Sequence, residues 1–167
     1  MHTISRATLH DAPAMLLLQR RAFEEEGRRV GRLPDGQEIP PLAEPVEAIE
    51  AHIREQTAFV ARLDGCVIGT VRGVVADRVC RVRALAVDSA FRGRGIGSAL
   101  LRALEQAVTE VDRFDLTTNT AMEGNVPFYE RHGYRVIGVD HPRANVELAQ
   151  MTKPSVRGGA ATPVTGP

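Results

Sequence analysis

The chain has 167 residues, of which 43% are hydrophobic, enough to form the core of one domain. Its 21 lysines and arginines balance 21 aspartates and glutamates. This balance argues against a nucleic-acid-binding or membrane-surface protein, because such proteins usually carry an excess of basic residues. No apolar stretch has the length of a membrane-spanning helix or the features of a signal peptide, so we expect a cytoplasmic protein.

The N-terminal third of the chain is predicted to form one strand and two helices. Residues 3–8 are suited to a short strand, and Asp11 is suited to cap a helix that has Pro13 in its first turn. The segment 27–45 is rich in glycine, proline and charged residues and is predicted to be a loop. A second amphipathic helix is expected over residues 45–56.

Two apolar stretches, residues 59–63 and 67–75, flank an Asp-Gly turn and predict a β-hairpin. The two cysteines, Cys66 and Cys80, lie in predicted strands. They could face each other across a hairpin, but buried thiols are the simpler interpretation. No histidine stands near them at ligand spacing, so the sequence gives no metal-binding signal.

The next predicted strand, residues 79–87, changes character along its length. Arg81 and Arg83 share one face, but Leu85 and Val87 continue that face as apolar side chains. Either another layer covers the second half of the strand, or a β-bulge shifts the phase of its side chains. Both alternatives fit a strand whose end lines a ligand-binding cleft.

A loop that contains Gly93, Gly95 and Gly97 follows this strand and leads directly into an amphipathic helix. Glycines let a ligand approach the backbone closely, and the first turn of a helix has unpaired N–H groups and partial positive charge. Arg92 and Arg94 add full positive charges. The sequence therefore predicts a binding site for the pyrophosphate of a cofactor.

This loop differs from two common phosphate-binding fingerprints. A Walker loop needs a Gly-Lys-Ser/Thr sequence, which does not follow these glycines. A dinucleotide-binding fingerprint needs a third glycine at the position that Ser98 occupies. A nicotinamide-dependent enzyme is therefore the weaker alternative.

The remainder of the chain predicts three strands and one short helix, namely strands over 114–118, 134–139 and 146–151 and a helix over 126–132 that ends at Gly133. From residue 154 onward the sequence lacks the apolar pattern of a packed element. We therefore expect an α+β fold with a mixed sheet, a single domain over residues 1–153 and a flexible tail over residues 154–167.

Two motifs of the chain together resemble the GNAT superfamily of N-acetyltransferases. Residues 92–97, Arg-Gly-Arg-Gly-Ile-Gly, are similar to the family's Arg-x-x-Gly-x-Gly motif. Residues 125–134, Asn-Val-Pro-Phe-Tyr-Glu-Arg-His-Gly-Tyr, resemble its C-terminal Asn…Phe-Tyr-Glu-Arg-x-Gly-Phe segment, with Tyr134 in place of the usual phenylalanine. The resemblance covers roughly residues 3–153, and the motifs look most like those of small-molecule acetyltransferases of the puromycin type.

The resemblance implies a mixed, mostly antiparallel sheet of about seven strands flanked by about four helices, with a bulge in the fourth strand. It implies acetyl-CoA as the acyl donor, with the thioester lying where two strands splay apart, and it implies no metal. The residues that it assigns to cofactor binding are Leu85, Ala86, Val87, Arg92, Gly93, Arg94, Gly95, Ile96, Gly97, Ser98, Asn125, Phe128, Tyr129 and Arg131.

The resemblance also implies two proton-transfer roles. Tyr129 is the expected general acid for the departing CoA thiolate. Because a thiol has a pKa of about 8.5 and a tyrosine one of about 10, this transfer costs roughly 2 kcal/mol in water, and the site must lower that cost. The carboxylate that many relatives carry on the fourth strand is missing, so the candidate base lies among Glu24 to Glu26 at the end of the first helix, with Glu26 preferred. His132 and His141 are further alternatives.

The expected acceptor is a primary amine of a small molecule or peptide, attacked directly in a ternary complex. A protein N-terminal or lysine acetyltransferase is one alternative, and a non-catalytic acyl-CoA-binding sensor domain is another. We expect neither a nucleic-acid nor a membrane partner, and association into a homodimer is left open.

Overall fold

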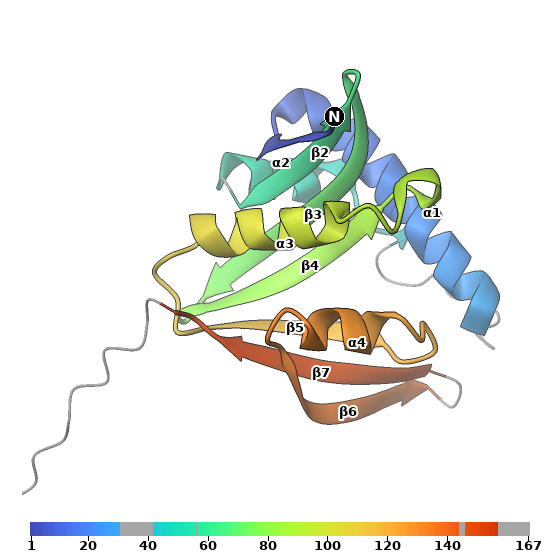
Figure 1. Ribbon diagram of the computed structural model, residues 1–167, viewed down its shortest axis with the longest axis vertical. Coiled ribbons are helices and arrows are strands. Elements are labelled where there is room, and N and C mark those ends of the chain that lie inside the picture. Colours follow the sequence, from blue (N-terminus) through green and yellow to red (C-terminus); the bar gives the residue numbers. More distant parts are fainter. Residues whose placement is uncertain (31–41, 56, 144–145, 157–167) are drawn as a thin grey trace, which may run out of the picture.

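The computed structural model describes residues 1–30, 42–55, 57–143 and 146–156 (Figure 1). The main elements are β1 (Thr3–Arg6), α1 (Ala12–Val30), α2 (Val46–Arg54), β2 (Ala58–Leu63), β3 (Cys66–Ala76), β4 (Val79–Val87), α3 (Ile96–Ala107), β5 (Arg113–Asn119), α4 (Asn125–Glu130), β6 (Arg135–Arg143) and β7 (Val146–Pro154). Two short 3₁₀ helices are η1 (Leu9–Asp11), before α1, and η3 (Ser89–Phe91), before the glycine loop.

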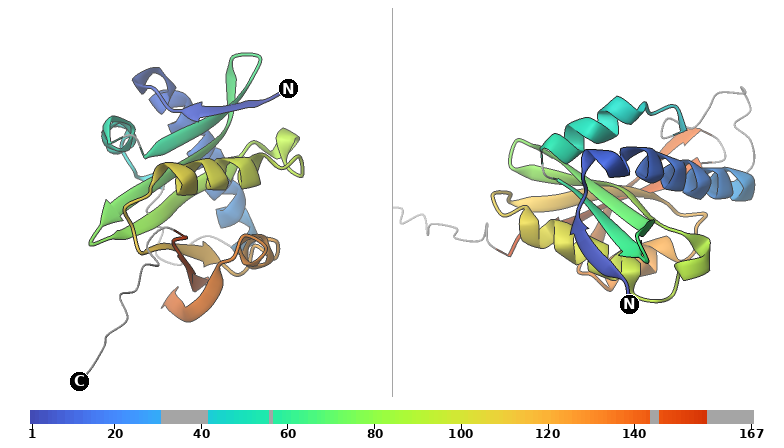
Figure 2. Two further views of the ribbon diagram at one scale, coloured as in Figure 1. Left: turned by 60° about the vertical axis from the view of Figure 1, so that its left-hand side comes forward. Right: turned by 90° about the horizontal axis from the view of Figure 1, so that it is seen from above.

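The strands form one sheet of seven in the order β1-β2-β3-β4-β5-β7-β6. Neighbouring strands are antiparallel except β4 and β5, which run parallel. Helices α3 and α4 lie on one face of the sheet, and α1 and α2 lie on the other (Figure 1, Figure 2). The α+β fold with a mixed, mostly antiparallel sheet is therefore confirmed.

The parallel pairing of β4 with β5 is short. It joins Val79–Arg81 to Arg113–Asp115 and goes no further. Beyond this point β4 continues along β3 and β5 continues along β7, so the two strands diverge (Figure 1). Over the second half of β4, the backbone edges of β4 and β5 that face each other are therefore not paired with each other.

A β-bulge interrupts the pairing of β3 with β4 and explains the change in pattern along β4. Thr70 pairs with Ala86 and Arg72 pairs with Arg83, so one residue of β3 faces two of β4. Within the bulge, Ala84 has a φ of 50°, a left-handed conformation that is costly for a residue with a Cβ. The bulge, rather than a covering layer, is therefore the alternative that shifts the side-chain phase.

Close packing of α3 on β3 places the start of this helix. Its buried residues Leu100 and Leu104 lie against the sheet in the main core. A Cβ added to Gly69 would stand 2.9 Å from Leu100, and one added to Gly73 would stand 3.1 Å from Leu104. Because side chains at these two positions would push the helix away, the glycines of β3 allow α3 to approach the sheet.

The sequence-based prediction for the end of the first helix is wrong. Helix α1 continues to Val30, so residues 27–30 are helical rather than part of the predicted loop. Arg28 also donates a hydrogen bond from its Nε to the main-chain carbonyl of Glu24 over 3.3 Å, so its side chain folds back on the preceding turn of the helix. Residues 31–41 of the predicted loop lie outside the described residues.

The cysteines also depart from the prediction. Cys80 is fully buried, but Cys66 is exposed because it begins β3 directly after the hairpin turn. The two do not face each other, since Cys80 pairs with Val75 and Cys66 pairs with Leu63. Among the described helices, none is long and apolar enough to cross a membrane.

Candidate active site

The glycine loop has the geometry that the sequence predicts. Gly93 and Gly95 have φ values of 74° and 76°, and residues 92–95 are exposed. A Cβ added to either glycine would meet nothing within 4 Å, so the left-handed backbone rather than crowding requires glycine there. Gly95 is the N-cap of α3, which begins at Ile96. The first-turn amides of α3 therefore stand beside an accessible loop.

The two arginines of the loop have different surroundings. Arg92 forms a bidentate ion pair with Glu25 of α1, with nitrogen–oxygen distances of 3.0 and 2.7 Å. Arg94 instead lies over the ring of Phe91, with its guanidinium carbon 5.4 Å from the ring centre. Arg94 therefore keeps a full positive charge at the loop, whereas the charge of Arg92 is shared with a carboxylate.

Helix α4 reaches the start of α3 through an aromatic contact. A Cβ added to Gly97 would lie 3.5 Å from the ring of Phe128 and 3.8 Å from Val87 at the end of β4. At the start of α4, Asn125 donates a hydrogen bond to Thr118 of β5 over 3.0 Å. The structure thus gathers the predicted cofactor residues of β4, α3 and α4 around the point where β4 and β5 diverge. Arg131, at the C-cap of α4, is exposed.

Tyr129 lies in an aromatic group on α4. Its ring makes edge-on contacts with Phe128 and Tyr134, with ring centres 5.1 and 5.7 Å away. Burial and the nearby negative charge of Glu26 raise the pKa of Tyr129 above its usual value. The hydroxyl therefore keeps its proton at neutral pH. Its role as a general acid toward a bound thioester stays a prediction.

Glu26 lies on α1, on the other side of the sheet from α4, and its negative charge acts on Tyr129 (Figure 1). Burial raises the pKa of Glu26 above its ordinary 4.5, and a side-chain hydrogen bond with Asn119 partly opposes this shift. Asn119, at the end of β5, accepts a hydrogen bond from the Ala121 N–H through its side-chain oxygen, which leaves its amide nitrogen for other acceptors. A carboxylate with a raised pKa is a better proton acceptor near neutral pH.

The three consecutive glutamates of α1 therefore have separate surroundings. Glu24 is exposed, and Glu25 is engaged with Arg92. Glu26 is the one whose charge acts on Tyr129. Sequence reasoning missed Asn119, which stands at the end of a strand that already alternates apolar and polar residues and so gives no distinct signal.

A buried polar network on the α1–α2 side was also missed. The guanidinium of Arg72 on β3 is only 1% exposed and donates to Glu44, which precedes α2, over 2.7 Å and to Gln19 of α1 over 2.6 Å. It also lies 3.1 Å from Nδ1 of His52 on α2. Burial would raise the pKa of Glu44, but hydrogen bonds from Arg72 and Gln19 outweigh it and lower the pKa. The network joins both helices to the sheet.

Two cavities of the described structure bear on the position of the site. One, of about 400 Å³, lies between α1 and the end of β4 and is lined by Leu18, Arg21, Ala22, Glu25, Arg28, Val87, Asp88, Ser89 and Arg92. It adjoins the glycine loop through the Arg92–Glu25 pair.

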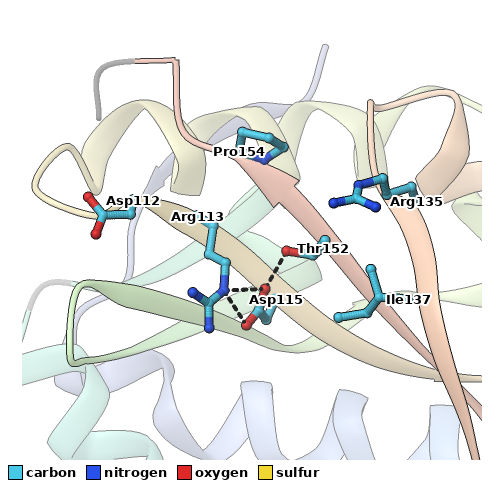
Figure 3. A pocket seen from close by; sticks show the side chains of 7 residues that line it. All are labelled: Asp112, Arg113, Asp115, Arg135, Ile137, Thr152 and Pro154. Carbon is cyan, nitrogen blue, oxygen red and sulfur yellow. Dashed lines mark hydrogen bonds and ion pairs between the residues drawn. The ribbon is translucent and has the colours of Figure 1, made fainter. Parts of the chain in front are cut away.

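The other cavity, of about 420 Å³, lies at the start of β5, away from the residues gathered at the end of that strand (Figure 3). There Asp115 accepts hydrogen bonds from Arg113 and Thr152, so the charged groups of this cavity neutralise each other. Nothing in this second cavity matches the predicted site residues.

Comparisons with known proteins agree with the sequence motifs. Residues 15–134 match the Acetyltransferase (GNAT) family. An uncharacterized N-acetyltransferase of Methanocaldococcus jannaschii is 35% identical over 80 residues, which cover 46% of this chain and 51% of that protein. The uncharacterized protein YxbD of Bacillus subtilis is 29% identical over 96 residues, which cover 56% of this chain and 57% of that protein. The chain thus spans about half the length of the curated relatives it matches.

Solved structures share the fold over most of their length. PaiA N-acetyltransferase from Thermoplasma acidophilum, in complex with coenzyme A, has a TM-score of 0.76 and 15% sequence identity, covering 92% of this chain and 99% of that one. The ribosomal-protein-alanine N-acetyltransferase from Brucella melitensis has a TM-score of 0.69 and 19% identity, covering 91% and 99%. At these identities, the likeness shows a common fold.

Proposed function

The chain belongs to the acetyltransferase (GNAT) family, and on that premise we propose that it transfers an acetyl group from acetyl-CoA to a primary amine in a ternary complex. The observation that carries this proposal is the early divergence of β4 and β5 beside the glycine loop. A strand edge, a helix N-terminus and a proton donor stand around that divergence. An acyl thioester with a long amide-bearing arm and a diphosphate needs these three features.

The residues present fit acetyl-CoA. The N–H groups of residues 92–98 and the charge of Arg94 would hold the diphosphate. The edge of Leu85–Val87, unpaired with β5, would bind the amides of the pantetheine arm as an added strand does. Asn125 would exchange its bond with Thr118 for one to the same arm. When bound, acetyl-CoA supplies an activated acyl group whose thiol leaves as the amine attacks.

The backbone beyond the bulge offers a further contribution. Ala84 has a left-handed conformation within the bulge, and pairing with β3 resumes at Ala86 and Val87. The main-chain N–H groups of Leu85 and Val87 therefore lie beyond this change of direction, on the part of β4 that β5 leaves unpaired. We assign to one of them the polarisation of the acyl carbonyl. A fixed N–H donor stabilises negative charge that develops on such an oxygen, an effect worth about 3–4 kcal/mol in other enzymes.

The two proton-transfer residues are electrostatically coupled. Glu26 accepts the proton of the amine, directly or through water, and Tyr129 donates a proton to the leaving thiolate. The negative charge of Glu26 is one cause of the raised pKa of Tyr129. Protonation of Glu26 removes that cause, so Tyr129 becomes a stronger acid after the base has accepted its proton. A base and an acid that act on each other in this way would suit an enzyme better than an acyl-CoA sensor.

The acceptor is proposed as a primary amine, of a small molecule or of a peptide. A panel of amines mixed with the protein and acetyl-CoA, with free thiol followed over time, tests the proposal. Turnover with at least one amine is the expected result. A sensor would bind acetyl-CoA in calorimetry but release no thiol above background. The absence of CoA binding at millimolar concentration would overturn both readings.

Substitution of Tyr129 by phenylalanine separates binding from chemistry. Tyr129→Phe retains the ring contacts with Phe128 and Tyr134 but removes the proton donor. CoA affinity is expected to stay within about threefold, and the rate of thiol release to fall by roughly 10²–10⁴-fold, the usual range for a lost general acid. Unchanged turnover would remove Tyr129 from the mechanism.

A further inference from the structure

The first arginine of the glycine loop is attached to α1 rather than directed at the loop's own ligand site. Its two terminal nitrogens contact the two carboxylate oxygens of Glu25 at 3.0 and 2.7 Å, and its Nε donates to the Val87 carbonyl over 3.1 Å. The guanidinium is therefore fixed from both sides, by the end of β4 and by α1. A lysine could not reproduce this fork of donors.

Glu25 stands at a point where α1 needs support. Gly27 lies two residues further on, and glycine weakens a helix interior by about 1 kcal/mol relative to alanine. Glu26, the proposed base, lies between Glu25 and Gly27. The location of the Glu26 carboxylate therefore depends on how firmly this turn of α1 is held against the rest of the protein.

We propose that Arg92 and Glu25 are positioning residues that join the cofactor loop to α1 and thereby fix the position of the Glu26 carboxylate. This inference rests on the proposed function. Because Glu25 already balances the charge of Arg92, the diphosphate is recognised by the loop amides and Arg94. In this chain the side chain of the motif's first arginine thus connects the cofactor loop to the helix that carries the base, and we call the Arg92–Glu25 ion pair the strut.

Two consequences distinguish a strut from a phosphate ligand. Removal of the Arg92 charge by Arg92→Gln changes CoA affinity by less than about threefold, whereas Arg94→Gln weakens it by about tenfold, or about 1.4 kcal/mol. Loss of the strut instead affects the catalytic step. Glu25→Gln, Arg92→Gln and Arg92→Lys are each expected to lower kcat by about tenfold, with the KM for acetyl-CoA nearly unchanged.

The experiment compares Glu25→Gln with the neighbouring control Glu24→Gln, which alters an exposed side chain of the same helix. Amide hydrogen exchange of the free protein reports on residues 22–30, and calorimetry reports on CoA binding. Glu25→Gln should accelerate exchange in α1 and lower kcat, and Glu24→Gln should change neither. In the Arg92→Gln background, Glu25→Gln should have no additional effect.

The outcomes separate this inference from the proposed function. Equal exchange rates in the Glu25→Gln and Glu24→Gln proteins would overturn the proposed positioning role of the strut. A loss of CoA affinity in Arg92→Gln that equals the loss in Arg94→Gln would overturn it as well. A wild-type protein that binds no CoA and releases no thiol overturns the proposed function instead. The exchange measurement on the free protein still decides whether Glu25 anchors α1.

Discussion

Replacement of the buried Arg72 by methionine is expected to destabilise the protein strongly. The side chain of Arg72 is 2% exposed and that of Glu44 is 12% exposed, and they are joined at 2.7 Å. Arg72→Met keeps most of the apolar volume but leaves the Glu44 carboxylate buried without its cation. Breaking a buried ion pair on one side costs about 3–5 kcal/mol. This is a large part of the roughly 5–15 kcal/mol that stabilises an ordinary domain.

Urea unfolding followed by circular dichroism measures this loss at pH 7. A loss of about 3–5 kcal/mol corresponds to a fall in the melting temperature of roughly 6–20 °C for a chain of this size. The double variant Arg72→Met with Glu44→Leu should recover most of the stability, because it removes the stranded charge as well. A loss below about 1 kcal/mol, or a double variant as unstable as the single one, would refute the reasoning.

The pH dependence of this loss has a definite sign. In the wild-type protein the pKa of Glu44 is lowered, so its contribution to stability is present above the unfolded pKa and is lost as the pH falls through the folded pKa. Without Arg72, only the hydrogen bond from Gln19 and the charge of Arg83 oppose the effect of burial, so the pKa of Glu44 is higher than in the wild-type protein. The carboxyl group then becomes neutral at a higher pH, so the deficit of Arg72→Met should shrink between pH 7 and about pH 4.

Three further outcomes are expected. Because the pKa of Glu26 is raised, kcat should fall as the pH drops through a value above 4.5. Glu26→Gln should lower kcat and abolish this acid limb in a pH–rate profile. A limb that persists in the variant would exclude Glu26 as the base. Gly95→Asp should abolish CoA binding in calorimetry, because it adds a side chain at a φ of 76° and a negative charge at the phosphate site; retained affinity would move that site elsewhere. Burial raises the pKa of Cys80 to about 12, whereas Cys66 is exposed. A thiol reagent at pH 8 should therefore react quickly with Cys66 and with Cys80 only after denaturation. Rapid reaction of two thiols per native chain would contradict the burial of Cys80.

Several features of the site could be predicted because they depend on residues close together in the sequence. The loop from Arg92 to Gly97 needs left-handed backbone and a helix start, and its glycines and the apolar periodicity after it specify both. The break in alternation between Arg83 and Leu85 likewise predicted either a bulge or a covering layer before any strand partner was known, and the pairing with β3 shows the bulge. Such features are local because backbone conformation is set by neighbouring side chains.

The other half of the site depends on contacts between distant segments. Nothing near Arg72 in the sequence indicates Glu44 or Gln19 as its partners, because these residues are 28 and 53 positions away from it. The length of α1 was also misjudged, because composition alone favoured a loop where tertiary contacts and helical pairs support another turn.

The sequence by itself determined the fold class, the glycine loop and the identity of the aromatic segment that carries Tyr129, since each is encoded by a short run of residues. Only the tertiary structure decided that Glu25 holds Arg92 while the charge of Glu26 acts on Tyr129. Adjacent residues on a helix point about 100° apart, so the packing of α1 against the sheet selects which glutamate faces which partner.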